Sequence, residues 1–293
     1  MKPAPFEYFA PETVDEALRL LAEHADVAKV IAGGQSLGPL LNMRLARPDL
    51  LIDLNRLREL DYLRDDDGAL VIGALTRQRA VERSRRVSAD WPLLHEAVGY
   101  IGHPTIRNRG TVGGSVAHAD PSAELPAVVT ALEAELRIRG PRGERTVAPR
   151  DFFLTYLTTS LAPDELLVEV RLPPRPPRTG YAWEEYARRH GDFALAGVAA
   201  TISLAPDGVC TSARLVYTGV GPVPFDAHQA AELLVGQPPS SQAFSLAAER
   251  AAAECEPDSD LHASADYRRH LVRGLTRRAL ERAAARVTDG TGA

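Results

Sequence analysis

The stretch that decides the fold is RNRGTVGGSVAHADP at residues 107–121, and AGGQSL at residues 32–37 repeats its central feature. Each stretch contains a pair of glycines followed closely by a serine. Because a glycine pair carries no side chains, consecutive backbone N–H groups can turn inward as a concave nest around phosphate oxygens, with the serine hydroxyl as a further donor. Two such loops predict a diphosphate group that is held from both sides.

The shorter stretch lies in a predicted β–α–β unit. Apolar residues indicate strands at 29–32 and 50–53 and a short helix at 37–43, so the loop follows directly on a strand. Thr13 and Glu16 have the spacing of a capping box and predict a further helix ahead of this unit. The loop has neither the G-x-G-x-x-G spacing of a Rossmann nucleotide site nor the G-x-x-x-x-G-K-[ST] spacing of an ATP phosphate loop, which argues against both classes.

Composition excludes several kinds of partner. The 293 residues suffice for one large or two ordinary domains, and a net charge of −5 argues against nucleic acid or an anionic membrane, because both bind basic surfaces. The N-terminus lacks a secretion signal and no run approaches membrane-spanning length, so we expect a cytoplasmic protein with no membrane insertion. Cys210 and Cys255 are too few for an iron–sulfur cluster, and His103 and His118 lack ligand spacing, so no metal site is predicted.

A cluster of prolines divides the remaining chain. Before it, the patterns predict one helix at 91–100. They also predict strands at 69–72, 135–139, 145–147 and 165–172. The run PPRPPR at residues 173–178 fits neither a central strand nor a helix. After it, we expect strands at 193–204 and 209–217 and helices near 226–235, 240–253 and 266–287. The predicted domains are therefore 1–174, with lobes 1–54 and 55–174, and 179–293.

The two glycine stretches, together with PDELL at 163–167 and RHGDFA at 189–194, carry a family resemblance. In order and separation they resemble the FAD-binding medium subunit of molybdenum hydroxylases, the family of the carbon monoxide dehydrogenase flavoprotein and of the xanthine dehydrogenase FAD domain. The resemblance covers nearly the whole chain. It implies an α+β protein: a two-lobed FAD-binding domain of the vanillyl-alcohol-oxidase type (PCMH type), followed by a small α+β C-terminal domain.

The resemblance also implies where FAD lies. Both glycine loops would wrap the diphosphate, Ile101 would press on the flavin or adenine, Leu167 would lie near the adenine, Glu124 would face the ribityl chain, and Phe193 would cover the flavin ring. Asp120 fits a turn equally well. The implied FAD-binding residues are Ala32, Gly33, Gly34, Gln35, Ser36, Leu37, Ile101, Thr111, Val112, Gly113, Gly114, Ser115, Asp120, Glu124, Leu167 and Phe193. No residue is assigned a catalytic role.

One position departs from the family pattern. Relatives often carry a lysine shortly before the Gly-Asp-aromatic segment, whereas this chain has Glu184 and Glu185 there. A positive charge near the ring favours the anionic reduced flavin. An acid at this place therefore makes reduction harder unless it is protonated or turned away from the flavin.

The family resemblance implies an electron-transfer role. The chain would take electrons from 2Fe-2S clusters of a small iron–sulfur subunit and pass them to an external acceptor, while a large molybdopterin subunit oxidises the substrate. The expected assembly is a dimer of such heterotrimers. Two alternatives remain open: a stand-alone flavin-dependent oxidase or reductase of the same fold, and a non-catalytic flavoprotein such as a redox sensor or an assembly scaffold.

Overall fold

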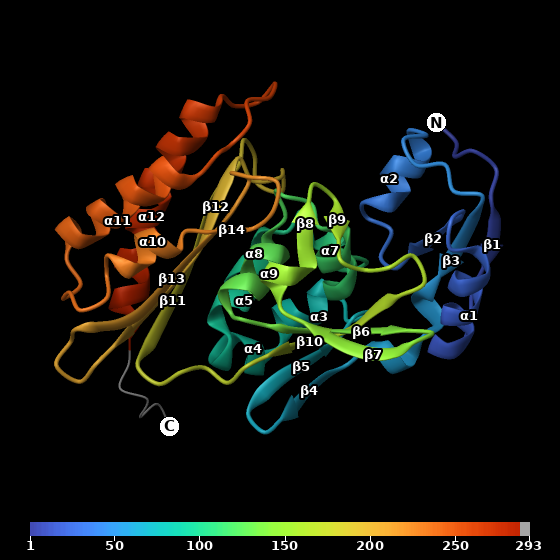
Figure 1. Cartoon of the computed structure of the whole chain (residues 1–293), viewed down its shortest axis with the longest axis horizontal. Coiled ribbons are helices and arrows are strands. Elements are labelled where there is room, and N and C mark those ends of the chain that lie inside the picture. The colour runs from blue at the N-terminus through green and yellow to red at the C-terminus, as the bar shows by residue number, and fades with distance from the viewer. Residues whose placement is uncertain (288–293) are drawn as a thin grey trace.

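The computed structural model describes residues 1–287, which form three parts in a row (Figure 1). Each part has its own sheet, and the order of the parts along the chain is also their order in space (Figure 1). Buried apolar side chains form three clusters. This mixture of helices and strands confirms the predicted α+β class, and the last predicted residues of the C-terminal domain, 288–293, lie outside the described part.

The N-terminal part is a parallel sheet in the order β1-β3-β2. Its elements are β1 (Glu7–Phe9), α1 (Val14–His24), β2 (Ala28–Ile31), α2 (Leu37–Asn42) and β3 (Leu50–Asp53). Helix α1 begins where the capping box predicts, because the Thr13 hydroxyl accepts the Glu16 N–H at 3.2 Å. The predicted β–α–β unit is confirmed, and the first glycine loop joins β2 to α2.

The middle part is an antiparallel sheet in the order β4-β5-β10-β6-β7. Its strands are β4 (Leu63–Asp66), β5 (Ala69–Gly73), β6 (Glu135–Gly140), β7 (Gly143–Val147) and β10 (Leu166–Leu172), with the separate hairpin β8 (Phe153–Thr155) and β9 (Thr158–Thr159). Its helices are α3 (Gln78–Arg83), α4 (Arg85–Asp90), α5 (Pro92–Tyr100), α6 (Pro104–Arg107), α7 (Val112–His118), α8 (Glu124–Ala131) and α9 (Pro149–Phe152). Two 3₁₀ turns, Leu54–Arg56 and Arg58–Leu60, connect this part to the N-terminal one.

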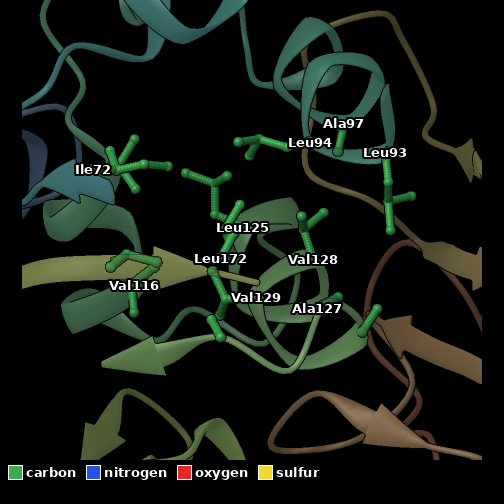
Figure 2. Packing of buried hydrophobic residues seen from close by; sticks show 14 of the residues in the cluster. Ile72, Leu93, Leu94, Ala97, Val116, Leu125, Ala127, Val128, Val129 and Leu172 are labelled. Carbon is green, nitrogen blue, oxygen red and sulfur yellow. The ribbon is translucent and has the colours of Figure 1, made fainter. Parts of the chain in front are cut away.

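Helices α5, α7 and α8 build the largest cluster against the middle sheet. Its labelled side chains in Figure 2 are Ile72, Leu93, Leu94, Ala97, Val116, Leu125, Ala127, Val128, Val129 and Leu172. The cluster continues into the C-terminal sheet through Tyr181 and Trp183. The helix that carries the second glycine loop is therefore anchored in the core of the molecule.

The C-terminal part is an antiparallel sheet covered by helices on both faces (Figure 1). Its elements are β11 (Thr179–Tyr186), β12 (Ala196–Leu204), β13 (Cys210–Thr218), β14 (Phe225–Asp226), α10 (His228–Glu232), α11 (Ser241–Glu254) and α12 (Ala265–Ala285). Helices α11 and α12 cover the outer face, and α5 and α8 of the middle part lie on the inner face. At Gly180 a side chain would overlap the carbonyl of Ala283, so glycine allows α12 to lie directly on β11.

The structure corrects three predicted boundaries. The helix expected at 226–235 is only α10, because Phe225–Asp226 pairs with β13 as a strand. The strand expected from residue 193 begins at Ala196, and the strand expected at 29–32 ends at Ile31. The proline run at 173–178 contains no helix or strand, as its composition predicts.

Candidate functional site

The first glycine loop presents a row of free backbone donors. Residues 33–36 lead from β2 into α2, and Gly34 has φ +71°, a backbone conformation that favours glycine. Within residues 1–287, no hydrogen-bond acceptor reaches the N–H groups of these four residues. The Gln35 amide donates to the Gly33 carbonyl oxygen at 2.9 Å and braces the loop. The loop can therefore donate to an anion without losing an internal hydrogen bond.

The second glycine loop is the amino-terminal turn of α7, and its donors are arranged differently. Four N–H groups donate within the protein, from Val112 to Thr76 O (3.0 Å), from Gly113 to Ala74 O (2.9 Å), from Gly114 to Thr111 Oγ1 (3.1 Å) and from Ser115 to Thr111 O (3.2 Å). The expectation that all these N–H groups face a ligand thus differs from the structure. Within residues 1–287, the donors of this stretch that have no acceptor are the Thr111 N–H and the hydroxyls of Thr111 and Ser115.

The structure brings the two loops into contact. A Cβ atom at Gly33 would overlap the Arg109 carbonyl oxygen and lie 2.8 Å from Gly110 Cα, and one at Gly114 would lie 3.7 Å from Ala32 Cβ. Only a residue without a side chain at position 33 allows this approach of the two backbones. The spacing of the motifs predicts two loops around one group, and the structure places the two stretches in contact with each other.

Two residues that sequence reasoning missed hold the loops together. The Arg77 guanidinium donates to Arg109 O at 2.6 Å and to Asn55 Oδ1 at 2.6 Å. The Asn55 amide in turn donates to Ala32 O at 2.8 Å. This chain of hydrogen bonds links the end of β2 to the approach of α7, and a single arginine far from either motif gives no sequence signal for it.

Arg107 fixes the segment between the two helices α5 and α7. The side chain is 5% exposed and makes two hydrogen bonds to Glu82, at 2.8 and 3.0 Å. It also donates to the carbonyl oxygens of Ile101 (2.9 Å) and Gly102 (3.1 Å). The hydrogen bond from Arg107 is the main reason that the pKa of Glu82 is lowered to about 2. Arg107 is therefore a brace of the loop that presents Ile101.

The other predicted site residues lie in different surroundings. Asp120 accepts the Ser122 N–H at 2.9 Å, which is the turn role expected for it. Leu167 is 6% exposed and packs within the cluster of the middle sheet, whereas Phe193 is 59% exposed in the loop after β11. Glu124 is the first residue of α8 and is only 4% exposed, and burial is the main cause that raises its pKa well above the ordinary range.

Strand β11 sends its two glutamates to opposite faces. Ala182 belongs to the cluster under α12, and Trp183 belongs to the cluster of the middle part, as alternation along a strand requires. Glu184 lies on the α12 side and pairs there with Arg282 and with Arg278, the latter at 3.5 Å. Glu185 shares the inner face with Trp183, whose indole N–H donates to it at 3.1 Å.

Comparison with known proteins identifies the family that has these features. Residues 4–175 match the model of the FAD-binding domain in molybdopterin dehydrogenase, and residues 181–283 match that of the carbon monoxide dehydrogenase flavoprotein C-terminal domain. The chain belongs to this flavoprotein family. It is therefore an oxidoreductase subunit with an FAD-binding domain, and the resemblance inferred from the sequence is confirmed.

Members of the family align with the chain over almost their whole length. The 6-hydroxypseudooxynicotine dehydrogenase complex subunit alpha of Paenarthrobacter nicotinovorans is 42% identical over 283 residues, 97% of this chain and 96% of the relative. The carbon monoxide dehydrogenase medium chain of Hydrogenophaga pseudoflava is 40% identical over 286 residues, 98% of this chain and 99% of the relative.

The fold agrees with a solved structure of the same family. Carbon monoxide dehydrogenase from Hydrogenophaga pseudoflava, in a form that lacks the Mo-pyranopterin moiety of the molybdenum cofactor, superimposes with a TM-score of 0.95 at 41% identity. The match covers 98% of this chain and 100% of that chain. This family member thus has the same pair of domains.

No helix within residues 1–287 is both long and apolar enough to cross a membrane.

Proposed function

We propose that the diphosphate of FAD binds between the two glycine loops. The observation that carries this proposal is the run of unpaired N–H groups at residues 33–36 in direct contact with the start of α7. Oriented backbone N–H groups suit phosphate oxygens, and the hydroxyls of Thr111 and Ser115 add donors from the other side. Leu37 packs beside the diphosphate in this proposal.

The flavin then extends toward the junction of the middle and C-terminal parts. We assign Ile101, Asp120 and Glu124 to this end of the cofactor, with Leu167 on the adenine side and Phe193 over the ring. The hydrogen bonds from Arg107 to the carbonyl oxygens of Ile101 and Gly102 support this assignment, because they keep the Ile101 segment in one place. The role of these residues is to bind and orient FAD, which itself accepts single electrons and releases them in pairs.

We propose that the electrons come from 2Fe-2S clusters of a small partner subunit and leave to an external acceptor. A large molybdopterin subunit would oxidise the substrate, and two such three-chain units would form the complete assembly in the cytoplasm. The full-length similarity to subunits of dehydrogenase complexes supports a multi-subunit role. Both cysteines of the chain are buried, which suits electron delivery by clusters in another chain.

The proposed units are 1–174 for FAD binding, with lobes 1–54 and 55–174, and 179–293 for the C-terminal domain. The proline run between them supports this division, because it lies outside all four sheets of the described chain.

Native purification tests the proposal. The chain should copurify with an iron–sulfur chain and a large molybdenum chain in equal amounts, and heating should release free FAD, since nothing in the two loops invites a covalent link. A chain that purifies without partner chains and oxidises an organic substrate by itself would contradict the electron-transfer role. A colourless protein that takes up no added FAD would contradict the binding site.

A further inference from the structure

Two glutamates from neighbouring elements, the buried Glu124 and the half-buried Glu185, meet at the junction of the middle and C-terminal parts. Glu185, Gly197 and Thr218 lie side by side across β11, β12 and β13. A Cβ atom at Gly197 would lie 2.9 Å from Thr218 Cγ2 and 3.5 Å from Glu185 Cγ, so these side chains share one face. The Thr218 hydroxyl lies 2.8 Å from the carbonyl oxygen of Ala123, the residue before Glu124. The sheet thus brings Glu185 to the amino-terminal end of α8.

The two carboxyl groups have no cation partner. Within residues 1–287, no ion pair involves Glu124 or Glu185. Asp120 before α8 and Arg107 of α6 act on the charge of Glu124, and Tyr100 of α5 lies near Glu185. Around Tyr100 lie Glu96 of α5, Glu184 of β11 and Arg282 of α12. Both arginines are engaged elsewhere, Arg107 by Glu82 and Arg282 by Glu96 and Glu184.

Two neighbouring carboxylates without a cation strongly resist ionising together. Burial raises the pKa of both groups, and the charge of Glu185 raises the pKa of Glu124 further. The pKa of Glu185 reaches about 7, although the hydrogen bond from Trp183 lowers it. Such a pair loses its two protons in separate steps, and between the two steps it holds a single proton.

We propose that Glu124 and Glu185 share one proton and that this carboxyl pair tunes the reduction potential of FAD in this chain. The inference rests on the proposed FAD site, at whose flavin end Glu124 lies. It goes beyond FAD binding, because it assigns a proton-dependent function to Glu185, a residue outside the implied FAD-binding set. Glu185 acts here as a tuning residue and not as a catalytic one.

The coupling follows from charge balance. Electrons delivered by the partner's iron–sulfur clusters add negative charge beside the pair, so a carboxylate of the pair takes up one proton from solvent and forms one O–H bond. When the external acceptor removes the electrons, this O–H bond breaks and the proton returns to solvent. A negative charge on the pair opposes reduction. In Glu185→Gln the buried Glu124 keeps the proton, so the site becomes neutral and the potential rises.

Infrared titration of the FAD-free full chain tests the shared proton. The wild type should keep a carboxylic-acid C=O band at a pH where ordinary glutamates are ionised. In Glu185→Gln and in Glu124→Gln the remaining glutamate should titrate at lower pH, because the like charge is gone, and the double variant should lose the band. A band that is absent from the wild type, or a midpoint that neither variant moves, would overturn the inference.

The reduction potential of the FAD-loaded full chain tests the effect on the flavin. Glu185→Gln should raise the ratio of reduced to oxidised FAD at least tenfold at a given potential, about 30 mV for a two-electron couple. Glu184→Gln is the matched control, since it removes the same charge from the other face of the same strand, and its shift should be several-fold smaller. Equal shifts in both variants would refute the role of the pair. If Glu185→Gln does not fold, Glu124→Gln serves for the same comparison, and failure of the wild type to bind FAD would instead contradict the proposed function.

Discussion

Gly33→Ala is the smallest change that tests whether contact between the two loops makes the FAD site. The added methyl group would overlap the Arg109 carbonyl oxygen and lie 2.8 Å from Gly110 Cα and 2.9 Å from Arg109 C. All three atoms belong to the backbone, so none can turn away as a flexible side chain would. Ordinary van der Waals contact begins at 3.4 Å, and the loops must therefore move apart by about half an ångström or more.

The size of the effect follows from this overlap. Forcing extra atoms into a packed contact costs about 1–3 kcal/mol. Separation of the loops also strains the hydrogen bond from Arg77 to Arg109, and one such bond contributes about 0.5–1.5 kcal/mol. If FAD binds only to the closed loops, about 2 kcal/mol of this cost appears in binding, which weakens FAD affinity roughly 30-fold.

Titration of the FAD-free full chain with FAD, followed by flavin fluorescence, measures this affinity. Gly274→Ala in α12 is the matched control, because a Cβ there meets nothing within 4 Å. The control should bind FAD as the wild type does and gain up to about 1 kcal/mol of stability from helix propensity. An unchanged dissociation constant in Gly33→Ala would refute the reasoning, since the loops could then not need their close contact to hold FAD.

Three further predictions concern residues around the site. Gly114→Ala places a Cβ 2.5 Å from Thr111 Oγ1, so it should disturb the cap of α7, lower the free energy of unfolding by about 1 kcal/mol and weaken FAD binding, as measured by denaturation and FAD titration. Glu82→Gln leaves the buried charge of Arg107 without its carboxylate and should lower the free energy of unfolding by about 3–5 kcal/mol near neutral pH. Because the pKa of Glu82 is lowered to about 2, the carboxylate stabilises the wild type at any pH above the ordinary glutamate pKa, and this stabilisation is lost as the pH falls toward 2. The wild type and the variant should therefore approach equal stability in acid denaturation. The pKa of Glu185 is raised to about 7, so between pH 4.5 and 7 the folded state holds a proton that the unfolded state has released. The free energy of unfolding of the wild type should therefore fall as the pH rises from about 4.5 to about 7. In urea titrations across this range, Glu185→Gln should show a smaller fall.

Local signals in the sequence were sufficient for the frame of the site. The two glycine stretches and the capping box at Thr13 depend on neighbouring residues alone, so the sequence predicts the β–α–β unit and its loop correctly, whereas the second stretch forms the first turn of α7. The order of the motifs along the chain also indicates the family. These signals indicate which backbone conformations and hydrogen bonds are possible at each position.

Contacts between distant segments gave no comparable signal. The N–H groups at the start of α7 donate to Thr76 and Ala74, which lie more than thirty residues earlier, so the number of free donors in the second loop depends on the tertiary fold. The link from Arg77 to Asn55 and the pair of Arg107 with Glu82 arise in the same way. A sequence rich in arginine offers many candidates for such pairs, and only the packing selects among them.

The two glutamates of β11 show where sequence reasoning stops. Alternation along a strand places Glu184 and Glu185 on opposite faces, but it does not say which face meets α12. That choice depends on Gly180, which lets α12 lie directly on its side of β11 and so puts Arg282 within reach of Glu184. Glu185 is then left on the face toward α8, where no arginine or lysine pairs with it in the described chain. The close packing of a helix on the outer face of the sheet thus decides which carboxylate remains unpaired on the inner one, at the end of the molecule where we place the flavin.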